Sequence, residues 1–171
     1  LFNGTDLAGW KANENPQTFS VNEGAIVASG PRSHLFYMGD VRGHSFRNFE
    51  LKVDVMTRPG ANGGIYILTG FQETGWPGKG FEIQVNNSYP RDPRRTGSIY
   101  QVKDVLTQEA RDNEWFTEHI VVRGDTITVR VNDKVVAEWT QPPGWNGTAE
   151  FPERKLPPGT IALQGHDPGS T

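Results

Sequence analysis

The sequence contains no cysteine, which excludes disulfide bonds, zinc–thiolate sites and thiol nucleophiles. It also lacks any apolar run near the ~20 residues that a membrane-spanning helix requires. An excess of positive charge is missing as well, because 17 Lys and Arg stand against 20 Asp and Glu, for a net charge of −3. Since affinity for nucleic acid rests on clustered basic side chains, we expect neither a nucleic-acid partner nor a membrane span.

A helical repeat is almost absent too, and the dominant spacing of apolar residues is two. Apolar and polar residues alternate in Phe49–Val55, Phe81–Val85 and Ile127–Val131, which predicts half-buried strands. The best helical candidate, Leu106–Asp112, is short, so we expect at most a turn or two of helix. Further strands are predicted at Thr18–Val21, Ala25–Ser29, His34–Met38, Gly64–Thr69, Ser98–Val102, Trp115–Arg123, Val135–Thr140 and Thr160–Gln164.

Turn-forming residues separate these runs. The 20 Gly and 12 Pro stand between short apolar segments, which is typical of an all-β chain with many turns. A chain of 171 residues is long enough to bury one sizeable core. We therefore predict a single all-β domain over residues 1–171, a sandwich or barrel of antiparallel strands. Two curved sheets would leave one concave outer face for a ligand.

A set of motifs occurs in an order that is similar to a known family. The motifs are Leu1–Trp10, Phe19–Val27, Asn48–Leu51, Gly60–Tyr66, Gly80–Val85, Thr96–Tyr100, Glu114-Trp115 and Gly159–His166. Together they resemble the 3-keto-disaccharide hydrolase domain family, whose fold is a concanavalin-A-like jelly-roll β-sandwich of two antiparallel sheets. The resemblance implies a bacterial protein that is secreted, periplasmic or on the cell surface. It also implies activity on glycosides oxidised at C3.

The two ends of the sequence carry expectations of their own. Because the sequence begins at Leu1 without Met, we expect a processed or trimmed N-terminus. The family usually continues past His166 into a last apolar strand, whereas this sequence stops at Thr171. We therefore expect that strand to be missing or supplied in another way, since its loss would leave an unpaired sheet edge.

Glu82 is the first candidate for catalysis. Within Phe81–Val85 the apolar side chains should face the core, so Glu82 and Gln84 should face the other way. The functional interpretation is a polar floor for a groove, with Glu82 as a base or metal ligand; the alternative is an ordinary solvated face. Retaining glycosidases need two carboxylates ~5–5.5 Å apart. This strand offers only Gln84 and Asn86 beyond Glu82, so it does not encode that machinery.

A substrate with a ketone at C3, as the resemblance implies, relaxes this requirement. The ketone acidifies the proton on C2, and its removal lets the oxygen on C1 leave by β-elimination. Such a reaction needs one base, one acid for the leaving group and a positive or hydrogen-bonding group near the enolate oxygen. Addition of water would complete a net hydrolysis. We predict Glu82 as the base and His166 and Tyr100 as its catalytic partners.

Other residues are predicted to bind the sugar. Rings and amides can stack on a sugar and hydrogen-bond to its hydroxyls. His119 is expected to be structural or exposed, and His34 and His44 to lie on the surface. The predicted substrate-binding residues are Gln84, Tyr66, Arg58, Arg123, Gln164 and Trp76.

A cofactor is not strongly indicated. Glu82, His166 and Asp167 could bind a divalent cation through oxygen and imidazole, although Asp167 equally suits the turn before Pro168. The expected ligand is an oligosaccharide or a 3-keto-glycoside. The main hypothesis is a hydrolase or lyase that cleaves 3-keto-glycosides. The alternatives are a carbohydrate-binding module without catalysis and a structural or adhesion domain.

Overall fold

The computed structural model describes residues 1–171, which form eleven strands and two short 3₁₀ turns. The 3₁₀ turns are Pro16–Thr18 and Val41–His44. The strands are β1 (Trp10–Ala12), β2 (Phe19–Asn22), β3 (Ala25–Ala28), β4 (Ser33–Tyr37), β5 (Phe49–Val55), β6 (Gly63–Thr69), β7 (Phe81–Val85), β8 (Phe116–Arg123), β9 (Thr126–Val131), β10 (Lys134–Thr140) and β11 (Thr160–Gly165).

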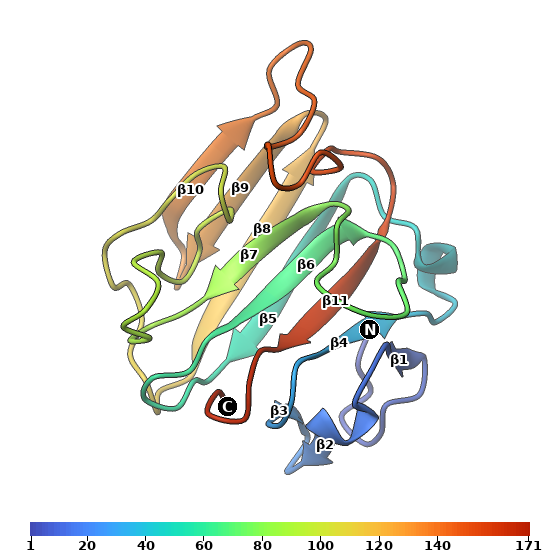
Figure 1. Ribbon diagram of the computed structural model, residues 1–171, viewed down its shortest axis with the longest axis vertical. Helices are drawn as coiled ribbons and strands as arrows, with labels where there is room; N and C mark the ends of the chain where they lie inside the picture. The colour runs from blue at the N-terminus through green and yellow to red at the C-terminus, as the bar shows by residue number, and fades with distance from the viewer.

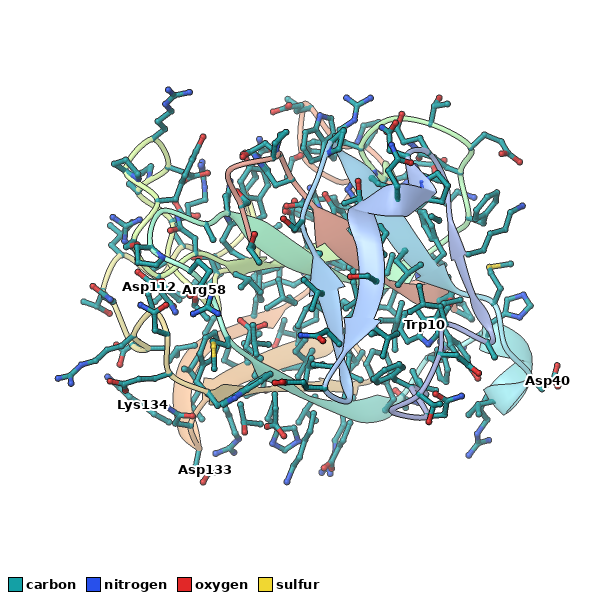
Figure 2. The ribbon with its side chains drawn as sticks, turned by 90° about the horizontal axis from the view of Figure 1, so that it is seen from below. Trp10, Asp40, Arg58, Asp112, Asp133 and Lys134 are labelled. Carbon is teal, nitrogen blue, oxygen red and sulfur yellow. The ribbon has the colours of Figure 1, made fainter.

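The strands form two main antiparallel sheets and a small hairpin. The five-stranded sheet has the order β1-β4-β11-β6-β7, and the four-stranded sheet has the order β10-β9-β8-β5 (Figure 1). The third sheet is the β2–β3 hairpin. Figure 2 shows the two main sheets edge on, as two layers. The prediction of a jelly-roll sandwich of antiparallel sheets is confirmed.

The core lies between the two sheets, where the alternating strands place their apolar side chains. It is one cluster of 17 buried residues drawn from both layers, so the sheets are held together by a single apolar interface. Phe81, Ile83 and Val85 of β7 belong to it, as their alternation predicts. Glu82 and Gln84 therefore point to the outer face of the five-stranded sheet.

Two local predictions were wrong. Ser98–Val102 is not a strand, because Ile99 makes only isolated bridges with Ile83 and Lys103, and its carbonyl accepts the turn bond from Val102. Gln101 also has a φ of 60°, which breaks an extended run. Leu106–Asp112 forms no helix; there the side chain of Gln108 donates to the carbonyl of Ala110, a local bond that competes with helix formation.

Two shorter elements complete the outline of the fold. β1 was not predicted, since three residues carry too little periodicity, yet it pairs with β4 at the edge of the five-stranded sheet. The β9–β10 turn is formed by Asn132 and Asp133, both with positive φ, as the turn chemistry of this segment predicts. The structure contains no helix with the length and apolar character needed to cross a membrane.

Candidate active site

Two neighbouring rows of side chains cross the outer face of the five-stranded sheet. In the first row, Tyr66 of β6 stands beside Glu82 of β7 on one side and Ala162 of β11 on the other. In the second row, Gly64 pairs with Gln84, and Gln164 pairs with His34 of β4. Three adjacent strands therefore bring one carboxylate, two amides and a phenol together.

Glu82 is at the centre of a hydrogen-bond network. The hydroxyl of Tyr66 donates to its Oε2 at 2.9 Å, and Nε2 of Gln164 donates to its Oε1 at 2.9 Å. The same Nε2 is 3.3 Å from the hydroxyl of Tyr66. Two donors on two strands thus fix the orientation of the carboxylate.

Burial raises the proton affinity of this carboxylate. Glu82 is only 6% exposed, and burial raises its pKa above the usual value, although the Arg154 guanidinium and the bonds from Tyr66 and Gln164 act in the opposite direction. Arg154 belongs to the segment between β10 and β11, and its NH2 lies 3.9 Å from Oε2 of Glu82. Sequence reasoning missed Arg154, because its segment has no strand periodicity.

A pocket of about 270 Å³ lies over Glu82 and contains most of the predicted site residues. Those that line it are Glu82, Gln84, Tyr66, Tyr100, Gln164, His166 and Trp76. The structure therefore brings together seven residues that were singled out separately in the sequence. Sequence reasoning did not assign the other lining residues, Asn62, Tyr89, Arg91, Asp92, Glu150 and Phe151, which come from loops and turns.

One wall of the pocket is aromatic. Trp76 packs against His34 and His166, with ring centroids 5.4 and 5.3 Å apart, and Tyr89 lies 6.0 Å from His166. Nδ1 of His166 is 2.6 Å from Oδ2 of Asp167, which orients the ring and leaves its Nε2 for a ligand. Partial burial opposes ionisation of Asp167, but the bonds from His166, Gly169 and Ser170 hold its pKa below the usual value.

Tyr100 lies on the other side of the pocket, beside two guanidinium groups. The Arg94 guanidinium lies 4.8 Å from the ring centre and the Arg154 guanidinium 5.8 Å from it. Burial and the Asp92 carboxylate raise the pKa of Tyr100, against the opposing effect of Arg94. The phenol therefore keeps its proton at neutral pH and is suited to act as a donor.

Two amide oxygens of residues that line the pocket have no protein partner. Nε2 of Gln84 donates to Oδ1 of Asn62 at 2.7 Å, but Oε1 of Gln84 is buried and unbonded, as is Oε1 of Gln164. Buried polar atoms normally have partners. Two free amide acceptors beside Glu82 are well suited to the hydroxyls of a sugar.

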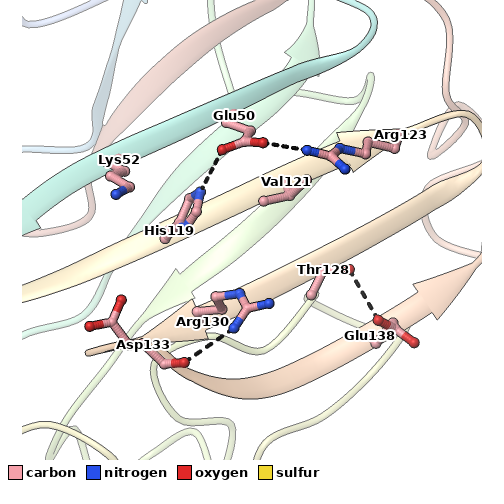
Figure 3. Close-up of a pocket in the computed structure, with 9 residues that line it drawn as sticks. All are labelled: Glu50, Lys52, His119, Val121, Arg123, Thr128, Arg130, Asp133 and Glu138. Carbon is pink, nitrogen blue, oxygen red and sulfur yellow. Dashed lines mark hydrogen bonds and ion pairs between the residues drawn. The ribbon is translucent and has the colours of Figure 1, made fainter.

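Two predicted sugar-binding residues lie elsewhere, so their assignment to this groove was wrong. Arg58 is turned away, at the end of the sandwich near Asp112, and its NH1 donates to Oδ1 of Asn113 at 3.0 Å (Figure 2). Arg123 is on the outer face of the four-stranded sheet, where it pairs with Glu50 (Figure 3). His34 was expected on the surface but is fully buried, and burial lowers its pKa to about 3.

Figure 3 shows a second hollow around Arg123, of about 410 Å³. Although it is larger, its charged groups are exposed and largely neutralise one another. Glu50 contacts Arg123 at 2.5 Å and His119 at 3.4 Å, and Thr128 bonds to Glu138. It holds no sequestered carboxylate, so the pocket over Glu82 is the stronger candidate for catalysis.

The residues considered for a divalent cation do not form a metal-binding cluster. His166 and Asp167 contact each other, but no group of three His, Cys, Asp or Glu side chains is arranged to hold an ion. No catalytic step is therefore assigned to a cation, and the sequence-based suggestion of one stays a prediction.

Comparison with known proteins identifies the family. Residues 1–170 match the domain described as 3-keto-alpha-glucoside-1,2-lyase-like. The chain belongs to this family. One relative is the 3-keto-disaccharide hydrolase of Bacteroides thetaiotaomicron, which is 24% identical over 172 residues, covering 82% of this chain and 59% of the relative. The chain thus spans about three fifths of the length of that relative.

Solved structures share the fold of this family member. A presumed glycosyl hydrolase from Parabacteroides distasonis superposes with a TM-score of 0.79 at 21% identity, covering 98% of this chain and 86% of the other. SCLam, a non-specific endo-β-1,3(4)-glucanase of family GH16, gives a TM-score of 0.60 at 15% identity, covering 96% and 80%. At these identities the similarity establishes the fold, and the function has to be argued from the pocket.

Proposed function

We propose that this domain cleaves the glycosidic bond of sugars that carry a ketone at C3, with Glu82 as the base. The observation that carries the proposal is a single buried carboxylate at the floor of a sugar-sized pocket. The two other carboxylates that line the pocket are engaged elsewhere: Asp92 pairs with Arg94, and Glu150 accepts a bond from Gln101. A reaction that needs one base suits this arrangement better than one that needs two carboxylates.

The reaction begins with transfer of the C2 proton to Glu82. The electron pair of the C2–H bond forms an enolate with the C3 ketone, and its collapse creates a C1–C2 double bond as the C1–O bond breaks. The departing oxygen takes a proton from an acid in the pocket. Water then adds across the double bond, so that the net reaction is hydrolysis; without this last step it is elimination.

Burial of Glu82 supports its role as a base. Because its pKa is raised, its ionised form binds a proton more strongly than an exposed carboxylate does, which favours abstraction of a weakly acidic C–H proton. Tyr66 and Gln164 hold the carboxylate in place. Tyr100 and His166 line the same pocket and are the two candidates for the acid.

The test uses Glu82→Gln, which keeps the shape of the side chain and removes the base. We expect it to lower kcat/KM on a 3-keto-glucoside by about 10²- to 10⁴-fold, as loss of a general base does. The wild-type protein should also exchange the C2 proton of the substrate with deuterium from solvent, and the variant should not. Full activity or full exchange in Glu82→Gln would rule out Glu82 as the base.

Glu50→Gln is the matched control, since the same chemical change then falls on the outer face of the four-stranded sheet. It should leave cleavage unchanged. Parallel assays with the unoxidised glucoside test the need for the ketone, and we expect no turnover of it. Binding of both sugars without cleavage of either would favour the carbohydrate-binding module instead.

A further inference from the structure

Arg154 is the largest side chain among the most deeply buried residues, and its guanidinium lies close to the proposed base. It is 1% exposed. Its backbone carbonyl accepts a bond from Nε1 of Trp145 at 2.6 Å, and its guanidinium packs on the Phe151 ring at 4.2 Å. Its NH1 reaches only the carbonyl of Gly80, at 3.5 Å.

The hydrogen-bonding capacity of this guanidinium is largely unused. Nε and NH2 have no hydrogen-bond partner, and the 3.9 Å from NH2 to Oε2 of Glu82 is too long for a hydrogen bond. Burying an unpaired guanidinium costs several kcal/mol in general, so an arginine is a poor choice for a purely structural role here. What the guanidinium provides at this distance is positive charge beside the carboxylate.

We propose that Arg154 is a positioning residue that sets the proton affinity of Glu82 through its charge, without touching the substrate. The inference rests on the proposed function. Arg154 is not among the residues that line the pocket, whereas Glu82 is. A carboxylate buried without a cation would stay protonated near neutral pH and could not accept the C2 proton.

Other groups face Glu82 from each neighbouring element, and none of them lowers its pKa as much as Arg154 does. Tyr66 on β6 and Gln164 on β11 are neutral donors to the carboxylate. His166, after β11, and Tyr100, in the turn after β7, also act on the site, and Tyr100 is neutral. Among the groups that lower the pKa of Glu82, Arg154 has the largest effect after burial has raised it.

The direct test is titration of the Glu82 carboxyl by ¹³C NMR, with the signal assigned by its loss in Glu82→Gln. We expect Arg154→Met to raise the pKa of Glu82 by about one to three units, and Arg154→Lys, which keeps the charge, to leave it close to wild type. The acid limb of the pH profile of kcat/KM should move upward by the same amount. Arg123→Met, on the other sheet, is the matched control and should change neither measurement.

An unchanged Glu82 pKa in Arg154→Met overturns the inference. If that variant does not fold, the double variant Glu82→Gln/Arg154→Met decides: recovery of a folded protein supports a role through charge, and failure to recover points to packing alone. The carboxyl titration needs no substrate. Absence of turnover by the wild-type protein would therefore refute the proposed function. The titration would still show whether Arg154 lowers the pKa of Glu82.

Discussion

At the residue scale, Gly64 provides the space that the side chain of Glu82 occupies. It lies on β6, opposite Gln84 and two residues before Tyr66, the partner of Glu82. A Cβ at this position would be 2.7 Å from Oε1 of Glu82 and 2.9 Å from its Cγ. Both distances are shorter than those that Cβ atoms make to their neighbours in proteins. The glycine is therefore needed for space: the side-chain hydrogen of Gly64 leaves room for the carboxylate.

We expect Gly64→Ala to displace Glu82 and lower kcat/KM by about 10²-fold, the effect typical of a misplacement near 1 Å. Gly63→Ala is the control on the same strand, because its Cβ would meet nothing closer than 3.7 Å. Steady-state kinetics with thermal unfolding of both variants is the measurement. Undiminished activity in a folded Gly64→Ala would mean that the position of the carboxylate does not limit the reaction.

The identity of the acid is a second question at the residue scale. Tyr100 keeps its proton at neutral pH, and we expect it to protonate the leaving oxygen. Tyr100→Phe should then slow release of a sugar by about 10²- to 10⁴-fold but hardly affect a 3-keto-nitrophenyl-glucoside, whose leaving group needs no acid. Comparing the two substrates in Tyr100→Phe and His166→Asn decides between the candidates, since the same pattern in His166→Asn alone would assign the role to His166.

At the scale of elements, the loop between β6 and β7 contributes Trp76 to the aromatic wall of the pocket. The side chain of Gln72 braces it, donating to the carbonyls of Thr74 at 2.6 Å and Trp76 at 2.8 Å and accepting from the amide of Gly78 at 3.1 Å. Trp76 is thus presented against His34 and His166 while remaining 38% exposed. A partly exposed indole held in this way can stack on a sugar ring.

Trp76→Ala should therefore weaken substrate binding more than catalysis. Aromatic contacts contribute about 0.5–1.5 kcal/mol, so we expect KM to rise up to about tenfold with kcat nearly unchanged. Trp115→Ala, at an exposed tryptophan outside the pocket, should leave both constants unaltered. A fall in kcat with an unchanged KM would place Trp76 in the chemical step instead.

The sequence predicts the face of a strand on which a side chain lies, but it does not predict the sheet that the strand joins or the burial that loops provide. Alternation in β7 predicts that Glu82 and Gln84 share a face, because side chains of a strand point to opposite sides in turn. It does not predict which sheet a strand joins, which is why Arg123, on β8 of the four-stranded sheet, was wrongly predicted to bind the sugar. Arg154 was missed, and His34 was wrongly expected on the surface, because burial by loops and distant strands leaves no periodic signal in the local sequence.

At the scale of the whole molecule, a second buried carboxyl lies inside the sandwich itself. Glu118 of β8 is fully buried, pairs in register with Val53 and Val131, and has no side-chain hydrogen-bond partner. Burial raises its pKa well above the usual 4.5, against a smaller opposing effect of the Gly97 amide. Since the two sheets share one core, the protonation state of this group affects the stability of the whole domain.

The direction of the effect follows from proton linkage. In the unfolded chain Glu118 ionises near pH 4.5, whereas in the folded protein it keeps its proton to a higher pH. Unfolding therefore releases a proton in this window, and the free energy of unfolding falls as the pH rises, by up to about 1.4 kcal/mol per pH unit. Glu82, whose pKa is also raised, contributes with the same sign.

We expect Glu118→Gln to remove one proton from this pH dependence, so that the free energy of unfolding declines less steeply above pH 4.5 than in the wild-type protein. Denaturant unfolding at a series of pH values measures the slope. Glu138→Gln, at an exposed carboxylate on β10, should leave the slope unchanged. Identical slopes in Glu118→Gln and the wild type would mean that folding does not raise the pKa of Glu118.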